Sequence, residues 1–143
     1  MKKHLLTLLG IIALAVPAKA QIYKGTTNLG GTASTLDITM DTRVDSVYME
    51  FSGPSSGYYA VGFGGYSMTN RYAVIVNSNG TLNERKLGNH NAGNSLINSV
   101  SYSATVSGTT RTTLIDRARV GASSDHFTFP LNGGSINLIW ARG

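Results

Sequence analysis

One segment of the chain alternates strictly between apolar and hydroxyl side chains. Val100, Tyr102, Ala104 and Val106 occupy one set of positions, and three serines and a threonine occupy the other. A period of two places successive side chains on opposite faces of a β-strand. We therefore expect a strand at 99–107 whose four apolar side chains point into a core and whose hydroxyl side chains face water.

Shorter runs of β-branched and aromatic residues recur through the rest of the chain, separated by turn signals such as Gly53-Pro54 and Gly133-Gly134. No stretch shows the three-to-four spacing of an amphipathic helix. The predicted fold is therefore all-β, an antiparallel immunoglobulin-like β-sandwich of about nine strands. The polar segment Gly88–Asn98 is expected to be a surface loop. The expected strands are 34–40, 45–52, 58–64, 72–77, 81–87, 99–107, 110–118, 126–130 and 135–141.

The first 20 residues have the layout of a secretory signal peptide. Two lysines precede an apolar run of 12 residues, Leu5–Val16, which is followed by a proline and the small-x-small triplet Ala18-Lys19-Ala20. The run is shorter than the roughly 20 apolar residues of a membrane span. We expect a signal peptide at 1–20, a single mature domain at 21–143, and a secreted or periplasmic protein that is not inserted in a membrane. The short leader is typical of bacterial proteins.

The positive charge of the chain comes mostly from this leader. The full sequence has a net charge of +5, but three of its 12 basic residues and none of its seven acidic residues lie in the first 20 positions. The mature domain therefore has nine basic and seven acidic residues, a net charge of +2. Its basic residues are scattered, whereas a nucleic-acid surface needs clustered positive charge. We expect no nucleic-acid partner.

The residues that most enzymes use are missing or poorly placed. The chain has no cysteine, which excludes disulfides, cysteine-ligated metals, thiol nucleophiles and covalent haem attachment. It has no Gly-x-Ser-x-Gly motif, and neither His90 nor His126 lies in a recognisable catalytic motif. Asp37, Asp41 and Asp45 are spaced by four on a strand-turn-strand segment, where they are expected to cap turns or face water. We predict that the protein is not an enzyme.

Four segments of the mature chain follow one another in a characteristic order. Gly57–Val76 contains an aromatic strand that ends in Gly-Phe-Gly, a loop with Met68 and a second apolar strand. Thr112–Arg117 is a strand with an arginine, Ser124-Asp125 an acidic turn, and Ile136–Gly143 a closing strand that ends in Trp-Ala-Arg-Gly. Together they resemble the DOMON family of secreted β-sandwiches, to which the N-terminal domain of dopamine β-monooxygenase and the cytochrome domain of cellobiose dehydrogenase are related.

The resemblance implies a ligand-binding domain for either b-type haem or sugars. In the haem-binding branch a methionine and a histidine ligate the iron, and the protein passes electrons to a redox partner protein. Met68 falls at the methionine position, but Leu138 stands where that branch has a histidine in its last strand, and leucine cannot bind iron. His126 is then the candidate second ligand. The haem hypothesis therefore names Met68 and His126 as cofactor-binding residues, and the haem iron as the only metal.

Sugar binding is the alternative. Tyr58, Tyr59, Tyr66, Tyr72 and Trp140 are its candidate ligand-binding residues, because aromatic rings provide flat stacking surfaces. Tyr58 and Tyr59 are adjacent in an expected strand, so they point to opposite faces and only one of them is expected to be exposed or to line a pocket. A third hypothesis is an extracellular structural or adhesive protein with no ligand, whose Ser/Thr/Asn-rich faces form a neutral surface.

Overall fold

The structure of the protein is a computed structural model that describes residues 21–30 and 34–143. The expected signal peptide, residues 1–20, lies outside the described residues. Within the part of the chain that is described, no helix is long and apolar enough to cross a membrane.

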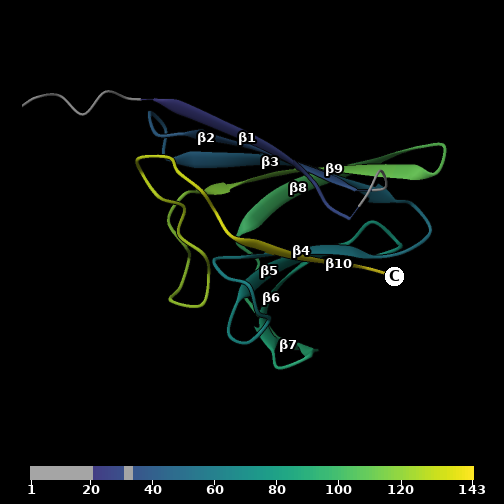
Figure 1. Ribbon diagram of the computed structural model, residues 1–143. Helices are drawn as coiled ribbons and strands as arrows, with labels where there is room; N and C mark the ends of the chain where they lie inside the picture. The colour runs from purple at the N-terminus through teal and green to yellow at the C-terminus, as the bar shows by residue number, and fades with distance from the viewer. Residues whose placement is uncertain (1–20, 31–33) are drawn as a thin grey trace, which may run out of the picture.

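The described residues form ten strands in two antiparallel sheets of five, which pack face to face as a β-sandwich (Figure 1). This confirms the predicted fold class. One sheet has the strand order β1-β2-β3-β9-β8 and the other β10-β4-β5-β6-β7. The strands are β1 Ile22–Asn28, β2 Thr35–Asp41, β3 Ser46–Pro54, β4 Tyr59–Phe63, β5 Tyr72–Val76, β6 Leu82–Gly88, β7 Asn91–Ser95, β8 Val100–Ser107, β9 Thr110–Ala118 and β10 Leu138–Arg142.

Eight of the nine expected strands are present, with ends that agree to within three residues. The strand expected at 126–130 is not formed, and this was a wrong prediction. The segment carries alternating aromatic residues, but its carbonyl groups accept hydrogen bonds from arginine side chains instead of from a partner strand. Arg117 donates to the carbonyl oxygen of Phe127 and Arg119 to that of Phe129, each over 2.7 Å. These guanidinium groups hold the β9–β10 connection against the end of the sandwich.

Two strands were not expected from the sequence, β1 and β7. β1 has Lys24 and Gly25 at its centre, which weakens the apolar alternation, yet it pairs with β2 along its whole length. β7 lies inside the expected loop 88–98 and has only one apolar residue. A tight turn creates it: His90 adopts a left-handed conformation (φ 55°), and β7 folds back on β6. The expectation that 88–98 is a loop was therefore wrong for its central part.

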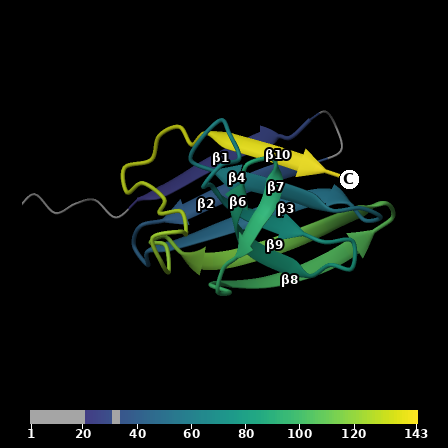
Figure 2. The ribbon, with the colours of Figure 1, turned by 90° about the horizontal axis from the view of Figure 1, so that it is seen from below.

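β8 has the predicted phase but not the predicted burial. Its register places Tyr102 opposite the buried Ile115 of β9, so its apolar side chains lie on the inner face of their sheet. Only Val100 is buried, however, while Tyr102 is 37% and Val106 58% exposed. β8 is the last strand of its sheet and lies along the margin of the molecule, beyond β7 (Figure 2). The expectation of four core side chains was therefore wrong, because the second sheet does not reach this far.

Tyr59 of β4 joins the two sheets at the centre of the core. Its ring meets that of Phe51 on β3 edge to face, with 4.6 Å between the ring centroids. Its hydroxyl group lies 3.0 Å from Oγ1 of Thr113 on β9. Gly53 of β3 lies against the ring, where a Cβ would come within 2.5 Å of a ring carbon. Tyr59 therefore combines aromatic packing with a buried hydrogen bond across the interface between the sheets.

A buried carboxylate, Glu84 of β6, lies where the chain passes from one sheet to the other. The hydroxyl group of Ser99, just before β8, donates to it over 2.7 Å, and the backbone N–H of Ser99 also donates. The hydroxyl group of Tyr72 on β5 donates over 2.6 Å, and the N–H of Leu96 donates to the backbone carbonyl of Glu84 over 2.9 Å. A buried carboxylate is tolerated only with such partners, so this cluster fixes the start of β8.

We expect Glu84→Ala to lower the free energy of unfolding by about 3 kcal/mol, because the Tyr72 hydroxyl and two Ser99 donors lose their buried acceptor. Tyr72→Phe removes one donor and should cost about 1 kcal/mol. Urea denaturation measures both values. Glu50→Ala is the matched control, since Glu50 is exposed on β3 opposite Asp37, and it should change stability by less than about 0.5 kcal/mol. Equal losses at Glu84 and Glu50 would contradict this role of Glu84.

Candidate functional site

His126 is buried, and both of its ring nitrogens are occupied. Nδ1 lies 2.8 Å from the hydroxyl oxygen of Ser123, and Nε2 lies 3.2 Å from the carbonyl oxygen of Ile97. Nε2 is also 3.8 Å from the carboxylate of Glu84, and the ring lies beside that of Tyr72 with 5.5 Å between centroids. The side chain therefore anchors the β9–β10 connection to the Glu84 cluster and has no free nitrogen for a metal ion.

Two of the five aromatic candidates for sugar binding are core residues. Tyr59 lies between the sheets and Tyr72 is bound to Glu84, and burial raises the pKa of both tyrosines, so they remain neutral at physiological pH. Tyr58 points to the opposite face from Tyr59 and is 43% exposed, which confirms the predicted division of the pair. Tyr66 is 84% exposed and does not line the groove described next.

A groove of about 450 Å³ crosses the outer face of the sheet formed by β10, β4, β5 and β6. Its floor is made of small residues in neighbouring strands. Ala141 of β10 lies opposite Ala60 of β4, and Gly62 of β4 lies opposite Ala73 of β5. Cross-strand partners share a face of a sheet, so these four small residues lie on the outer face. Ile139 covers Gly62, where a Cβ would lie 2.8 Å from one of its side-chain carbons, and Ile139 and Leu87 also line the groove. The volume lies in the range of small-molecule sites, about 300–1,000 Å³.

Tyr58 lines the groove next to the C-terminal residue. The backbones of Tyr58 and Gly143 exchange two hydrogen bonds, of 2.8 and 3.1 Å, and Gly143 lies so close to the tyrosine ring that a Cβ there would come within 2.5 Å of it. Trp140 lines the groove from β10, but its indole extends over Gly30, in the β1–β2 connection. The Tyr58 ring is therefore the aromatic surface that is held on the outer face, while Trp140 covers the seam between the sheets.

Polar side chains from β6 and its two flanking turns line the groove as well. Arg85 is held in place by its own hydrogen bonds, since Nε donates to the carbonyl of Ala92 over 2.7 Å and an Nη to that of Gly93 over 2.9 Å. Asn83 is exposed between two buried residues of β6, a period-two signal that could have placed it on the outer face. Sequence reasoning did not select these polar residues, which are Asn77, Asn83, Arg85, His90 and Asn91.

Met68 is half-buried and lines this same groove. The structure thus brings together three of the seven site residues predicted from the sequence, namely Met68, Tyr58 and Trp140. It does not bring Met68 and His126 together, because His126 belongs to the buried cluster around Glu84 and does not line the groove. The pairing of these two residues, on which the haem hypothesis depended, has no counterpart in the arrangement of the described residues.

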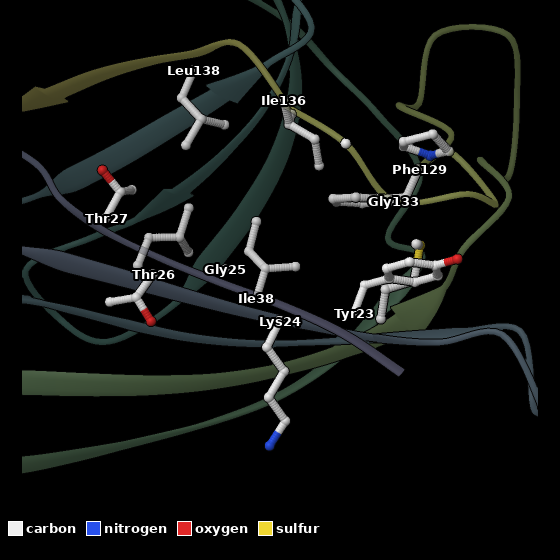
Figure 3. Close-up of a pocket in the computed structure, with 14 residues that line it drawn as sticks. Tyr23, Lys24, Gly25, Thr26, Thr27, Ile38, Phe129, Gly133, Ile136 and Leu138 are labelled. Atoms are coloured by element: carbon white, nitrogen blue, oxygen red, sulfur yellow. The ribbon is translucent and has the colours of Figure 1, made fainter. Parts of the chain in front are cut away.

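A second hollow, of about 290 Å³, opens between the two sheets beside β1 (Figure 3). Its lining is mostly apolar, with Ile38 of β2 on one side, and Leu138 of β10 and Ile136 of the β9–β10 connection facing it. Gly25 of β1 also borders the hollow, and a Cβ at this position would meet no heavy atom within 4 Å. The hollow therefore includes unfilled space over the centre of β1.

The residues that are present do not fit axial ligation of haem iron. Leu138, at the position where the haem-binding branch has its histidine, borders an apolar hollow, and the described residues that line this hollow include no histidine. Met68 lines the outer groove and His126 has both ring nitrogens in hydrogen bonds. Over residues 21–30 and 34–143, no group of three or more potential ligands could hold another metal ion. We therefore derive no haem chemistry from this site.

The space over Gly25 can be tested by filling it. We expect Gly25→Val to raise the free energy of unfolding by about 1 kcal/mol, because a strand glycine costs about 0.5–1 kcal/mol relative to alanine and the new side chain meets open space. Gly62→Val is the control, since a Cβ at Gly62 would lie 2.8 Å from a side-chain carbon of Ile139 and should destabilise the fold. Thermal or urea unfolding compares the two variants, and a destabilised Gly25→Val would show that the hollow is closed.

Comparisons of the chain with models of protein families, with curated proteins and with solved structures found no match. The fold is therefore established by the structure alone, and a function has to be derived from the geometry of the groove and the residues that line it.

Proposed function

We propose that this protein is an exported, non-catalytic carbohydrate-binding module of the DOMON type, with a mono- or disaccharide in the groove on the outer face of β10, β4, β5 and β6. The observation that carries the proposal is the exposed ring of Tyr58, held beside a floor of small residues and across from amide side chains. A sugar ring has apolar C–H faces and a rim of hydroxyl groups. Such a ligand needs an aromatic surface together with amide donors and acceptors.

Residues at the polar side of the groove have chemistry that suits hydroxyl groups. Asn83 can donate and accept at once, as one sugar hydroxyl does. Arg85 is already fixed by the carbonyls of Ala92 and Gly93, so little side-chain entropy is lost when its remaining N–H groups bind a ligand. Met68 adds a polarisable apolar contact. These features suit a ligand that has hydroxyl groups together with apolar C–H faces.

The composition of the groove also supports binding without catalysis. Hydrolysis of a glycosidic bond normally requires a pair of carboxylates at the scissile bond. The residues that line the groove in the described part of the chain include no aspartate or glutamate. The signal-peptide layout of residues 1–20 supports export, which would place the module where polysaccharides are met.

The proposal is tested by titrating the purified protein with neutral oligosaccharides and measuring the heat of binding by calorimetry. We expect binding of at least one cello-, xylo-, malto- or chito-oligosaccharide. Tyr58→Ala should weaken that binding about tenfold, which corresponds to about 1.4 kcal/mol. Asn83→Ala should weaken it to a similar extent through the lost hydroxyl contacts. Tyr66→Ala is the matched control, because Tyr66 is the more exposed tyrosine but lies outside the groove.

Two outcomes would contradict the proposal. If Tyr66→Ala weakens binding as much as Tyr58→Ala, the sugar binds elsewhere on the surface. If no oligosaccharide binds and protein from haem-supplied cells shows a Soret band that Met68→Leu alters, the protein is a haem-binding module instead. The two experiments distinguish the ligand classes, because calorimetry measures the heat of sugar binding and the absorption spectrum detects bound haem.

A further inference from the structure

The outer edge of β8 is a free strand edge. β8 pairs with β9 along all eight of its residues, and it is the last strand in the order of its sheet. In the part of the chain that the structure describes, no strand lies on its other side. Its outward-directed N–H and C=O groups therefore form a row of hydrogen-bonding positions that another strand can use.

The inner face of β8 is also uncovered. Tyr102, Ala104 and Val106 share the face of the buried β9 residues, yet all three are exposed. In the sequence, these residues belong to the strictest apolar alternation of the chain, a pattern that is typical of a strand with one buried face. Burial within a single chain therefore does not account for the apolar pattern. A further strand beside β8 would give these side chains cross-strand partners on the same face of the sheet.

β8 lacks the devices that usually protect an edge. Segment 96–110, which includes β8, contains no charged residue and no proline. The opposite edge of the same sheet is different, because β1 has Lys24 and Gly25 at its centre. Edge lysines oppose strand addition, and their absence permits it. A neutral edge also lets two identical copies approach each other without charge repulsion.

We infer that β8 pairs with β8 of a second copy of this chain, antiparallel and about a twofold axis, to form a dimer with a continuous ten-stranded sheet. Directly opposite residues of two paired strands lie on the same face of the sheet, so an inner-face residue of β8 must lie opposite an inner-face residue of the second copy. The twofold axis then passes between a residue and the same residue of the partner subunit. Placing Ala104 opposite Ala104 of the partner subunit pairs all of 101–107. It sets Tyr102 against Val106 of the partner subunit, an aromatic–β-branched pair, and Ser103 against Thr105 of the partner subunit.

This register explains why the second occupant is a copy of the chain. The segment is complementary to itself: its small residue lies at the axis, its large residues face one another, and its hydroxyl residues form the other face. A twofold pairing also closes, because both chains use the same edge and β8 then has no free edge left. The groove on the outer face of the other sheet stays free, so the inference does not depend on the proposed function.

Sedimentation of the purified protein over a range of concentrations tests this assembly. We expect a reversible dimer whose fraction rises with concentration. Ala104→Lys and Ala104→Glu should each raise the dissociation constant of the dimer about fivefold or more, because each places like charges opposite one another at the axis. A mixture of the two variants should restore the dimer, since opposite charges then meet. Circular dichroism confirms that each variant is folded.

Cross-linking provides an independent readout, because the chain has no cysteine of its own. Strand residues that lie directly opposite have Cα atoms about 4.5–5.5 Å apart, within the range of a disulfide. Mild oxidation of an Ala104→Cys variant should therefore give a covalent dimer. Leu114→Cys is the matched control, because Leu114 is 52% exposed but lies on the outer face of β9, away from the edge.

Three results would overturn the inference. A protein that stays monomeric up to its solubility limit has no β8 pairing. Polymers larger than a dimer would indicate head-to-tail addition of β8 to β1 instead of a twofold pair. Equal cross-linking at Ala104 and Leu114, or no rescue in the mixture of Lys and Glu variants, would show that the contact is non-specific or has another register.

Discussion

The buried carboxylate of Glu84 is the constraint on which the two-sheet arrangement depends. The chain leaves one sheet at β7 and enters the other at β8, and Ser99 is bound to Glu84 at that crossing. Tyr72 binds the same carboxylate, and His126 lies beside it. A carboxylate without these partners would be costly to bury. The cluster therefore fixes the crossing, the start of β8 and the position of the β9–β10 connection together.

Two inward-facing arginines of β9 hold the ends of the sandwich in a related way. Arg111 donates to the carbonyl oxygens of Asn77 and Ser55 over 3.1 and 2.9 Å, and Arg117 donates to that of Phe127. Loop carbonyls that have no partner in a sheet need donors when they are buried. A guanidinium group supplies several donors from one side chain. The loops at both ends are thus pinned to β9, which leaves the outer face of the other sheet free for the groove.

Sequence reasoning predicted eight strands from their runs of strand-forming residues, and the bounds of β9 were predicted without error. Alternation misled at 126–130, where the carbonyl groups of Phe127 and Phe129 bind arginine side chains instead of a partner strand. It missed β7, whose polar sequence pairs only because a turn at His90 directs it back to β6. The division between Tyr58 and Tyr59 followed from strand periodicity. The position of His126 did not, because Ser123, Ile97 and Glu84 meet it only in three dimensions. Partners that are distant in sequence decide whether a histidine is free, and periodicity carries no information about them.

Small residues on the outer face of β10, β4 and β5 set the shape of the groove. Glycine and alanine are poor strand residues, because they bring little side-chain packing to a sheet. Yet Ala60, Gly62, Ala73 and Ala141 occupy facing positions in three adjacent strands. At Gly62 the reason is packing, because a Cβ there would lie 2.8 Å from a side-chain carbon of Ile139, so this glycine makes room for its neighbour on β10. In the proposal that this face binds a sugar, Ala60 and Ala141 have the second role of keeping the space beside the Tyr58 ring open.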